Sequence, residues 1–200
     1  MKRPDPTNLS PQLLLSAYSQ GAFPMTDPDG VTRFYSTDPR GVLPLDGFHC
    51  PRTLRQWVKQ DRYQIRIDQD FAGTMRGCMD VPRPETNTSW ISDELIAAYV
   101  RLYELGFAHS VEAYQDNQLV GGLYGVSLGR AFFGESMFSR ERDASKVCLA
   151  HLVEHLHARG FELLDTQFTT EHLKRFGAVD VPRARYERML ADALSGEAKF

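Results

Sequence analysis

The stretch from residue 92 to residue 168 constrains the fold more than any other part of the chain. It begins with SDELIAAYVRLYELG at 92–106, where a serine N-cap, acids in the first turn and a closing glycine predict a helix. Three segments typical of strands follow, at 110–114, 118–128 and 131–138. Because only the polar turns QDNQ and GR separate them, the pattern predicts an antiparallel meander.

A second helix and a fourth strand complete this unit. Asp143 is expected to cap a helix that runs to Gly160, and the apolar run FELLDTQF at 161–168 predicts a short strand inside the sheet. Two more helices are expected near 170–176 and 183–194. This is an α+β order in which helices cover a mostly antiparallel sheet. It is also the order of a GNAT-type acyltransferase core.

The first 60 residues have a different character, dense in Pro, Asp and Gly. Such a composition predicts turns that join short elements, after one helix that begins near Ser10. A further helix is expected at about 51–60, where apolar residues recur at helical spacing. We therefore expect a small N-terminal subdomain at residues 1–40 and a catalytic domain at residues 41–200.

The composition limits the compartment and the partners. The 200 residues carry a formal net charge of −3, so contact with a nucleic acid would have to use a local basic patch. Cys50, Cys78 and Cys148 form no C-x-x-C pair, which fits a reducing compartment. The apolar run near the N-terminus is too short for a signal peptide, and no run of about 18 apolar residues occurs. We expect a cytoplasmic protein without a membrane partner, and a monomer.

Three polar side chains occupy strand positions that are usually apolar. These are Glu135 in FFGESMF, and Asp165 and Gln167 in LLDTQF. Because side chains alternate along a strand, Asp165 and Gln167 share a face, and Glu135 joins them if the two strands are neighbours. Burying such groups without partners costs about 1–3 kcal/mol each. They should therefore form a structural polar network or face a ligand.

Five segments carry a resemblance to a known family. They are YSTDPRGVL at 35–43, SWIS at 89–92, ELGFAHSVE at 104–112, GGLYGVSLGRAFFGESMFSRERDASK at 121–146 and LLDTQ at 163–167. Together, from about residue 9 to about residue 190, the chain resembles leucyl/phenylalanyl-tRNA-protein transferase. The resemblance implies two domains, the larger one GNAT-like. It also implies transfer of Leu or Phe, and less well Met, from tRNA to proteins that begin with Arg or Lys, which marks them for N-end-rule degradation.

By this resemblance Glu135, Asp165 and Gln167 occupy catalytic positions. An aminoacyl ester is already activated, so the enzyme chiefly has to orient the amine, which can supply up to about 7–11 kcal/mol. Our hypothesis is that the Gln167 amide oxygen, oriented by Asp165, accepts a hydrogen bond from the amine, while Glu135 attracts the cationic end of the acceptor. Gln167 is a base or a positioning group, and a neutral amide is a very weak base. The ester supplies the driving force, so no metal or organic cofactor is expected.

The resemblance also implies a pocket for the aminoacyl side chain and a place for the terminal adenosine. The pocket positions hold Leu123, Phe132, Leu149 and Leu156, four apolar residues that would equally suit an ordinary core.

Trp90 matches a family tryptophan that helps to hold the tRNA's terminal adenosine, consistent with base stacking worth about 1–3 kcal/mol. Where the family usually has FPW, this chain has Phe23-Pro24-Met25, so Met25 replaces a second stacking face by a thioether.

A basic run could meet the tRNA stem. Its members are Arg52, Arg55, Lys59, Arg62 and Arg66. Contacts to phosphates would be sensitive to salt and would read no sequence. The alternative interpretation is a solvated helix face.

Three other functions stay open at this point. A CoA-dependent N-acetyltransferase would bind pyrophosphate on backbone amides after the third meander strand, but the loop SRERDAS at 139–145 has acids and no glycine. The H-x-x-E-H pattern of His151, Glu154 and His155 is found in zinc peptidases, although it also suits the polar face of a helix. A non-catalytic RNA- or peptide-binding module would explain the basic run and Trp90 but not the three polar strand residues.

Overall fold

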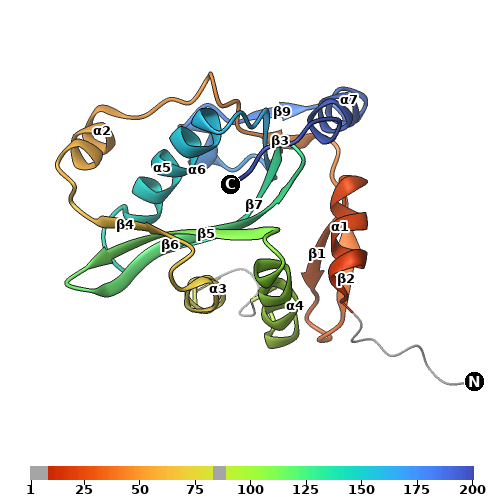
Figure 1. Ribbon diagram of the computed structural model, residues 1–200, viewed down its shortest axis with the longest axis horizontal. Helices are drawn as coiled ribbons and strands as arrows, with labels where there is room; N and C mark the ends of the chain where they lie inside the picture. The colour runs from red at the N-terminus through yellow and green to blue at the C-terminus, as the bar shows by residue number, and fades with distance from the viewer. Residues whose placement is uncertain (1–8, 83–88) are drawn as a thin grey trace, which may run out of the picture.

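The computed structural model describes residues 9–82 and 89–200, and its main feature is a seven-stranded sheet with the order β4-β5-β6-β7-β8-β3-β9 (Figure 1). The strands are β3 (Arg40–Val42), β4 (Gln64–Ile67), β5 (Ala108–Gln115), β6 (Gln118–Leu128), β7 (Ala131–Ser139), β8 (Leu163–Gln167) and β9 (Val179–Val181). Neighbouring strands run antiparallel except β7 and β8, which are parallel. The predicted α+β fold with a mostly antiparallel sheet is confirmed.

The predicted meander is β5, β6 and β7. Asp116 and Asn117 form the two-residue link between β5 and β6, and both have left-handed backbone conformations. Such residues suit the tight hairpin turns whose twist matches the sheet. The third strand then leads into α5 (Ala144–Ala158), which returns the chain to β8 at its side. This crossover makes β7 and β8 parallel neighbours.

Helices cover both faces of the sheet (Figure 1). The helices α3 (Phe71–Met79) and α4 (Asp93–Glu104) lie on one face, and α5 lies on the other with α2 (Arg52–Lys59) beside it. The predicted helix start at Ser92 is confirmed, because its Oγ accepts a hydrogen bond from the Leu95 amide at 3.2 Å. Two buried clusters follow from this arrangement, one on each side of the sheet.

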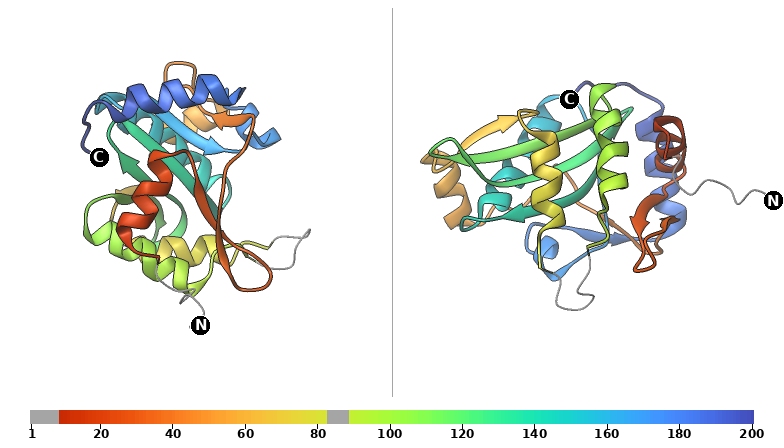
Figure 2. Two further views of the ribbon diagram at one scale, coloured as in Figure 1. Left: turned by 90° about the vertical axis from the view of Figure 1, so that its right-hand side faces the viewer. Right: turned by 90° about the horizontal axis from the view of Figure 1, so that it is seen from below.

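The N-terminal part forms its own layer beside one end of the sheet. It contains α1 (Pro11–Ser19) and a hairpin of β1 (Phe23–Thr26) and β2 (Thr32–Tyr35), and α1 lies between α4 and α7 (Arg183–Leu194) (Figure 2). The chain then enters the large sheet as β3, between β8 and β9. The division at residues 40 and 41 stays a prediction, and residues 1–8 of the expected subdomain lie outside the described residues.

The remaining elements include several that the sequence did not predict. The expected helix near 170–176 is the short α6 (Glu171–Lys174), and the one at 183–194 is α7. Strands β3, β4 and β9, hairpin β1–β2 and helix α3 were not anticipated. No helix in the described part of the chain is long and apolar enough to cross a membrane.

Candidate active site

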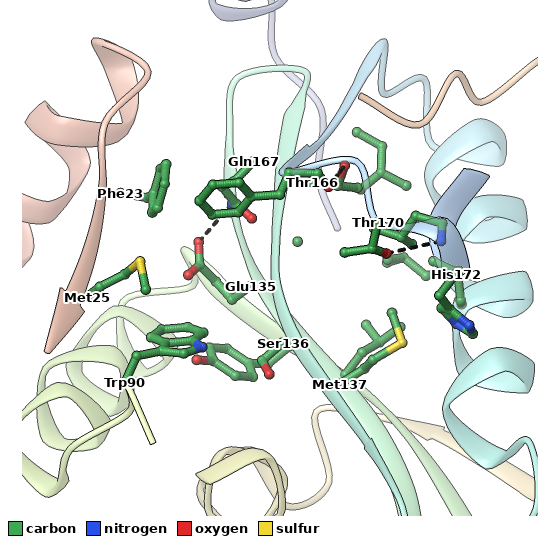
Figure 3. A pocket seen from close by; sticks show the side chains of 18 residues that line it. Phe23, Met25, Trp90, Glu135, Ser136, Met137, Thr166, Gln167, Thr170 and His172 are labelled. Atoms are coloured by element: carbon green, nitrogen blue, oxygen red, sulfur yellow. Dashed lines mark hydrogen bonds between the residues drawn. The ribbon is translucent and has the colours of Figure 1, made fainter. Parts of the chain in front are cut away.

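A pocket of about 290 Å³ opens where β7 and β8 face the N-terminal hairpin (Figure 3). Its walls come from β1, β6, β7, β8, α5, α6 and Trp90, which lies shortly before α4. The lining residues are Phe23, Met25, Trp90, Leu123, Tyr124, Gly134, Glu135, Ser136, Met137, Leu149, Leu152, Leu164, Thr166, Gln167, Phe168, Thr170, His172 and Leu173. Most of this lining is apolar, with Glu135 and Gln167 on one side.

Asp165 lies behind the pocket and is fully buried. The Arg40 guanidinium donates to both of its carboxylate oxygens, with Nε to Oδ1 at 2.9 Å and Nη2 to Oδ2 at 2.8 Å. The Tyr186 hydroxyl donates to Oδ2 at 2.5 Å, and burial raises the pKa of this phenol well above its usual range. Arg40 also donates to the Gly21 carbonyl at 2.7 Å. A buried, charge-assisted network therefore joins β3, β8, α7 and the end of α1.

Gln167 ends β8 in a backbone conformation that is rare for a residue with a side chain. Its φ is 55°, and the Phe168 amide donates to the Thr166 carbonyl at 2.5 Å, which makes a γ-turn centred on Gln167. Two groups hold this turn. Asp165 Oδ1 accepts a hydrogen bond from the backbone N–H of Gln167 at 2.8 Å, and the Thr37 hydroxyl donates to the backbone carbonyl of Gln167 at 3.0 Å. Asp165 therefore orients Gln167 through the main chain, whereas the sequence hypothesis left the route unspecified.

Glu135 and Gln167 come together because β7 and β8 are neighbours. Phe133 and Asp165 are paired in register, so the residues two positions on project side by side. The side-chain amide nitrogen of Gln167, Nε2, donates to Glu135 Oε1 at 3.4 Å (Figure 3). This bond leaves the amide oxygen of Gln167 as the acceptor that a substrate amine could reach. The expectation that the two strands are neighbours is confirmed.

Two tyrosines from different helices also hold Glu135. The Tyr18 hydroxyl donates to Glu135 Oε1 at 2.7 Å, and the hydroxyls of Tyr18 and Tyr99 are hydrogen-bonded to each other. Burial raises the pKa of Glu135 to about 7, against the opposing effect of the Tyr18 hydrogen bond. This carboxyl therefore titrates close to neutral pH. Neither tyrosine was singled out from the sequence, because a tyrosine on an amphipathic helix face looks like core.

The structure brings two of the four residues predicted for the aminoacyl pocket to the cavity. Leu123 and Leu149 line the cavity, whereas Phe132 and Leu156 are not among its lining residues. Both are fully buried, and Phe132 stacks on Phe200 with ring centroids 5.2 Å apart. Both belong to the buried hydrophobic cluster behind the pocket.

The apolar end of the pocket uses other residues that the sequence analysis missed. Met137 is the cross-strand partner of Leu123, and Leu152 follows Leu149 by one helical step on α5. Leu164 on β8 completes this wall. Cross-strand and i,i+3 spacing are signals that could have identified Met137 and Leu152.

Trp90 and Met25 meet at the other end of the pocket, as Figure 3 shows. The amide of Thr26 donates to the carbonyl of Trp90 at 3.0 Å, which ties β1 to the segment before α4. Phe23 and Phe168 line the same end. This rim is therefore built from aromatic and thioether groups.

The basic run lies elsewhere. Arg52, Arg55 and Lys59 are on α2, at the opposite end of the molecule from α1 (Figure 1). The guanidinium carbon of Arg62 lies 4.2 Å from the centroid of the Trp57 ring, and that of Arg66 lies 4.3 Å from the centroid of the Tyr114 ring. None of the five basic residues lines the pocket. Their role in phosphate binding stays a prediction.

Two alternative functions, the CoA-dependent N-acetyltransferase and the zinc peptidase, find little support in local geometry. In the loop before α5, the amides of Ala144 and Ser145 donate to Glu141 and to the Ser139 hydroxyl, so this loop's own oxygens occupy them. Within residues 9–82 and 89–200, no group of three or more His, Cys, Asp and Glu side chains is arranged to hold a metal ion.

The topology and the pocket define a class of protein: an α+β fold built on a mostly antiparallel sheet, in which an amide and a carboxyl adjoin an apolar chamber. The family model of the leucyl/phenylalanyl-tRNA protein transferase matches residues 42–191, and the model of that family's N-terminal domain matches residues 7–38. A leucyl/phenylalanyl-tRNA–protein transferase of Paramagnetospirillum magneticum is 54% identical over 196 residues, covering 96% of this chain and 92% of the relative. The chain belongs to the leucyl/phenylalanyl-tRNA–protein transferase family and is an aminoacyltransferase.

Solved structures show more distant likeness. The C-terminal domain of a putative lysylphosphatidylglycerol synthetase from Agrobacterium fabrum is 13% identical with a TM-score of 0.46, covering 91% of this chain and 62% of that chain. A tandem GNAT protein from the clavulanic acid biosynthesis pathway is 13% identical with a TM-score of 0.37, covering 90% of this chain and 58% of that chain.

Proposed function

We propose that this enzyme transfers leucine or phenylalanine, and methionine less well, from aminoacyl-tRNA to the N-terminal α-amine of proteins that begin with Arg or Lys. The transfer would mark those proteins for N-end-rule degradation in the cytoplasm, and the enzyme would act as a monomer. The observation that carries the proposal is the apolar chamber that ends at the hydrogen-bonded pair of Glu135 and Gln167.

The apolar half of the chamber is proposed to take the donor side chain. Leu123, Leu149 and Leu152 offer aliphatic surface, which cannot itself pair with a charged or polar side chain. A charged amino acid would lose its hydration there, which strongly disfavours it. Leucine and methionine would be separated only weakly, because one methylene in such a pocket is worth about 1–3 kcal/mol.

The reaction needs a neutral amine held against the ester carbonyl. In the proposed step the nitrogen of the acceptor attacks the carbonyl carbon, the bond to the ribose 3′-oxygen breaks, and that oxygen leaves with the proton lost by nitrogen. The Gln167 amide oxygen accepts a hydrogen bond from the attacking amine and so orients its lone pair. Because a neutral amide is a very weak base, we assign Gln167 to positioning. The amine, with a pKa of about 7.7–8, supplies enough neutral form itself.

Glu135 is proposed to favour acceptors with a cationic side chain. Its carboxyl lies beside Gln167, so a cation next to the reacting amine can reach it. The basic residues on and after α2 would contact tRNA phosphates. Since the ester is activated, the proposed reaction uses no cofactor.

The test is transfer of radiolabelled Leu, Phe and Met from charged tRNA to a model protein with N-terminal Arg, with acetyl-CoA as the competing donor. Gln167→Asn is the sharpest variant, because asparagine tolerates a positive φ while its shorter side chain withdraws the amide. We expect transfer from tRNA by the natural chain and a loss of about 10²-fold or more in the variant. Acetyl transfer without aminoacyl transfer, or full activity of the variant, would refute the proposal.

A further inference from the structure

Phe168 is a half-exposed aromatic residue in the pocket. Its relative exposure is 50%. Because Phe168 follows Gln167 directly, the γ-turn that orients the Gln167 side chain also orients the Phe168 ring. Gly41 on β3 allows the backbone of Phe168 to lie close to this strand, because a Cβ at residue 41 would lie 2.5 Å from the Phe168 carbonyl carbon. The ring meets Phe23 edge-on, with centroids 5.7 Å apart. Phe168 is therefore a positioned ring with an exposed face.

The chemistry of an aminoacyl-tRNA dictates what lies beside this ring. The ester oxygen belongs to the ribose of the terminal nucleotide, so the terminal base lies within one nucleoside of Gln167 and Glu135. Trp90 offers an aromatic ring at this end of the pocket, whereas Met25 beside it has no flat face. Stacking a base on an aromatic ring is worth enough to anchor a single-stranded end. Phe168 is a further aromatic residue that lines the pocket.

We propose that the terminal nucleobase of the donor tRNA stacks on Phe168. The inference rests on the proposed function and extends it to a nucleobase contact on the β8 side of the pocket. The residues around the ring favour a base over the acceptor's cationic side chain. Phe23, Met25 and Trp90 are neutral and apolar, which suits a flat uncharged ligand, whereas Glu135 provides the place for a cation.

The experiment compares Phe168→Leu with Phe168→Trp, using a short RNA ending in 3′-phenylalanyl-adenosine as donor. Leucine keeps an apolar side chain but has no aromatic face, and tryptophan keeps the face. Phe34→Leu is the matched control, because Phe34 is also exposed, on β2, and does not line the pocket. We expect Phe168→Leu to raise the KM for the donor by about 5-fold to 100-fold with little change in the KM for the acceptor, and Phe168→Trp to restore it.

A second donor separates a base contact from a structural effect. It is the same RNA with an abasic ribose at its 3′ end, charged with phenylalanine. With this donor Phe168→Leu should have no further effect on KM, because the stacking partner is already missing. An equal loss with both donors, a change only in the KM for the acceptor, or behaviour like that of Phe34→Leu would overturn the inference. Absence of transfer by the natural chain would instead refute the proposed function.

Discussion

Gln167 occupies a strained backbone conformation that its neighbours enforce. A non-glycine residue at φ 55° in a γ-turn is typically disfavoured by about 1–3 kcal/mol, and the surrounding structure must over-determine it. Here the Asp165 carboxylate accepts a hydrogen bond from the backbone N–H of Gln167, and the Thr37 hydroxyl donates one to the backbone carbonyl of Gln167. Asp165 thus serves as a fixed anion that sets the main chain, and its other donors, Arg40 and Tyr186, keep it in place.

Replacing Asp165 by Asn should therefore damage the fold as well as the turn. The variant leaves Arg40, which is 1% exposed, without its counter-charge, and breaking such a buried pair costs about 3–5 kcal/mol. Urea unfolding measures the loss. Asp29→Asn is the matched control, since Asp29 pairs with Arg33 at the exposed surface and should cost less than about 1 kcal/mol. Equal losses in the two variants would contradict a buried, stabilising network.

Glu135 should make stability depend on pH near neutrality. Its folded pKa is raised to about 7 from an ordinary 4.5, so the folded protein keeps a proton that the unfolded chain releases between these values. The free energy of unfolding contributed by this group therefore falls as pH rises from about 4.5 to about 7 and then levels off. Glu135→Gln removes the dependence.

The measurement is urea unfolding of both proteins at about pH 5 and about pH 8, with Glu104→Gln as an exposed control. The natural chain should lose stability relative to Glu135→Gln at the higher pH. A constant difference between them would show that Glu135 titrates as an ordinary carboxyl.

At the scale of elements, local signals explain which parts could be predicted. The helix α4 has a serine N-cap and apolar residues at helical spacing, and the long strands of the meander are separated only by short polar turns, so both were predicted. Strands β3 and β9 have three residues each, too few to show a period, and β3 pairs with strands distant in sequence.

The same reasoning applies to the candidate site. Glu135, Asp165 and Gln167 stood out as polar residues in apolar strands. Arg40 did not, because its partner Asp165 is 125 residues away and only the fold brings them together. Phe132 could not be distinguished from pocket residues, since core and pocket are both apolar.

Gly41 on β3 should be essential for the γ-turn centred on Gln167. An added Cβ would lie 2.5 Å from the Phe168 carbonyl carbon and 2.8 Å from the Thr169 nitrogen, and these backbone atoms cannot rotate away. We expect Gly41→Ala to lower the free energy of unfolding by about 1–3 kcal/mol and to reduce transfer. Thermal unfolding and the transfer rate check this. Gly47→Ala is the control, because its Cβ would meet its nearest atom at 3.4 Å.

At the scale of the whole molecule, the N-terminal layer and the large sheet build the pocket together. Phe23 and Met25 come from β1, while Glu135 and Gln167 come from β7 and β8. The basic run lies on and after α2, and its last member, Arg66, lies on β4 at one edge of the large sheet.

Salt dependence tests the basic run. The double variant Arg52→Gln, Arg55→Gln should reduce the slope of log KM for charged tRNA against log salt by about 1 per lost phosphate contact, while transfer from a short charged RNA stays unchanged. Arg188→Gln on α7 serves as the control, because it removes one exposed charge elsewhere. An unchanged slope in the double variant would assign these residues to a solvated helix face.

The most direct measurement is mass spectrometry of a peptide with N-terminal Arg after incubation with phenylalanyl-tRNA and the enzyme, beside the same peptide with an acetylated N-terminus. We expect one added phenylalanine on the α-amine of the free peptide, none on the acetylated one, and a strongly reduced yield with Gln167→Asn. An unmodified free peptide, or phenylalanine attached to a side chain, would contradict this expectation.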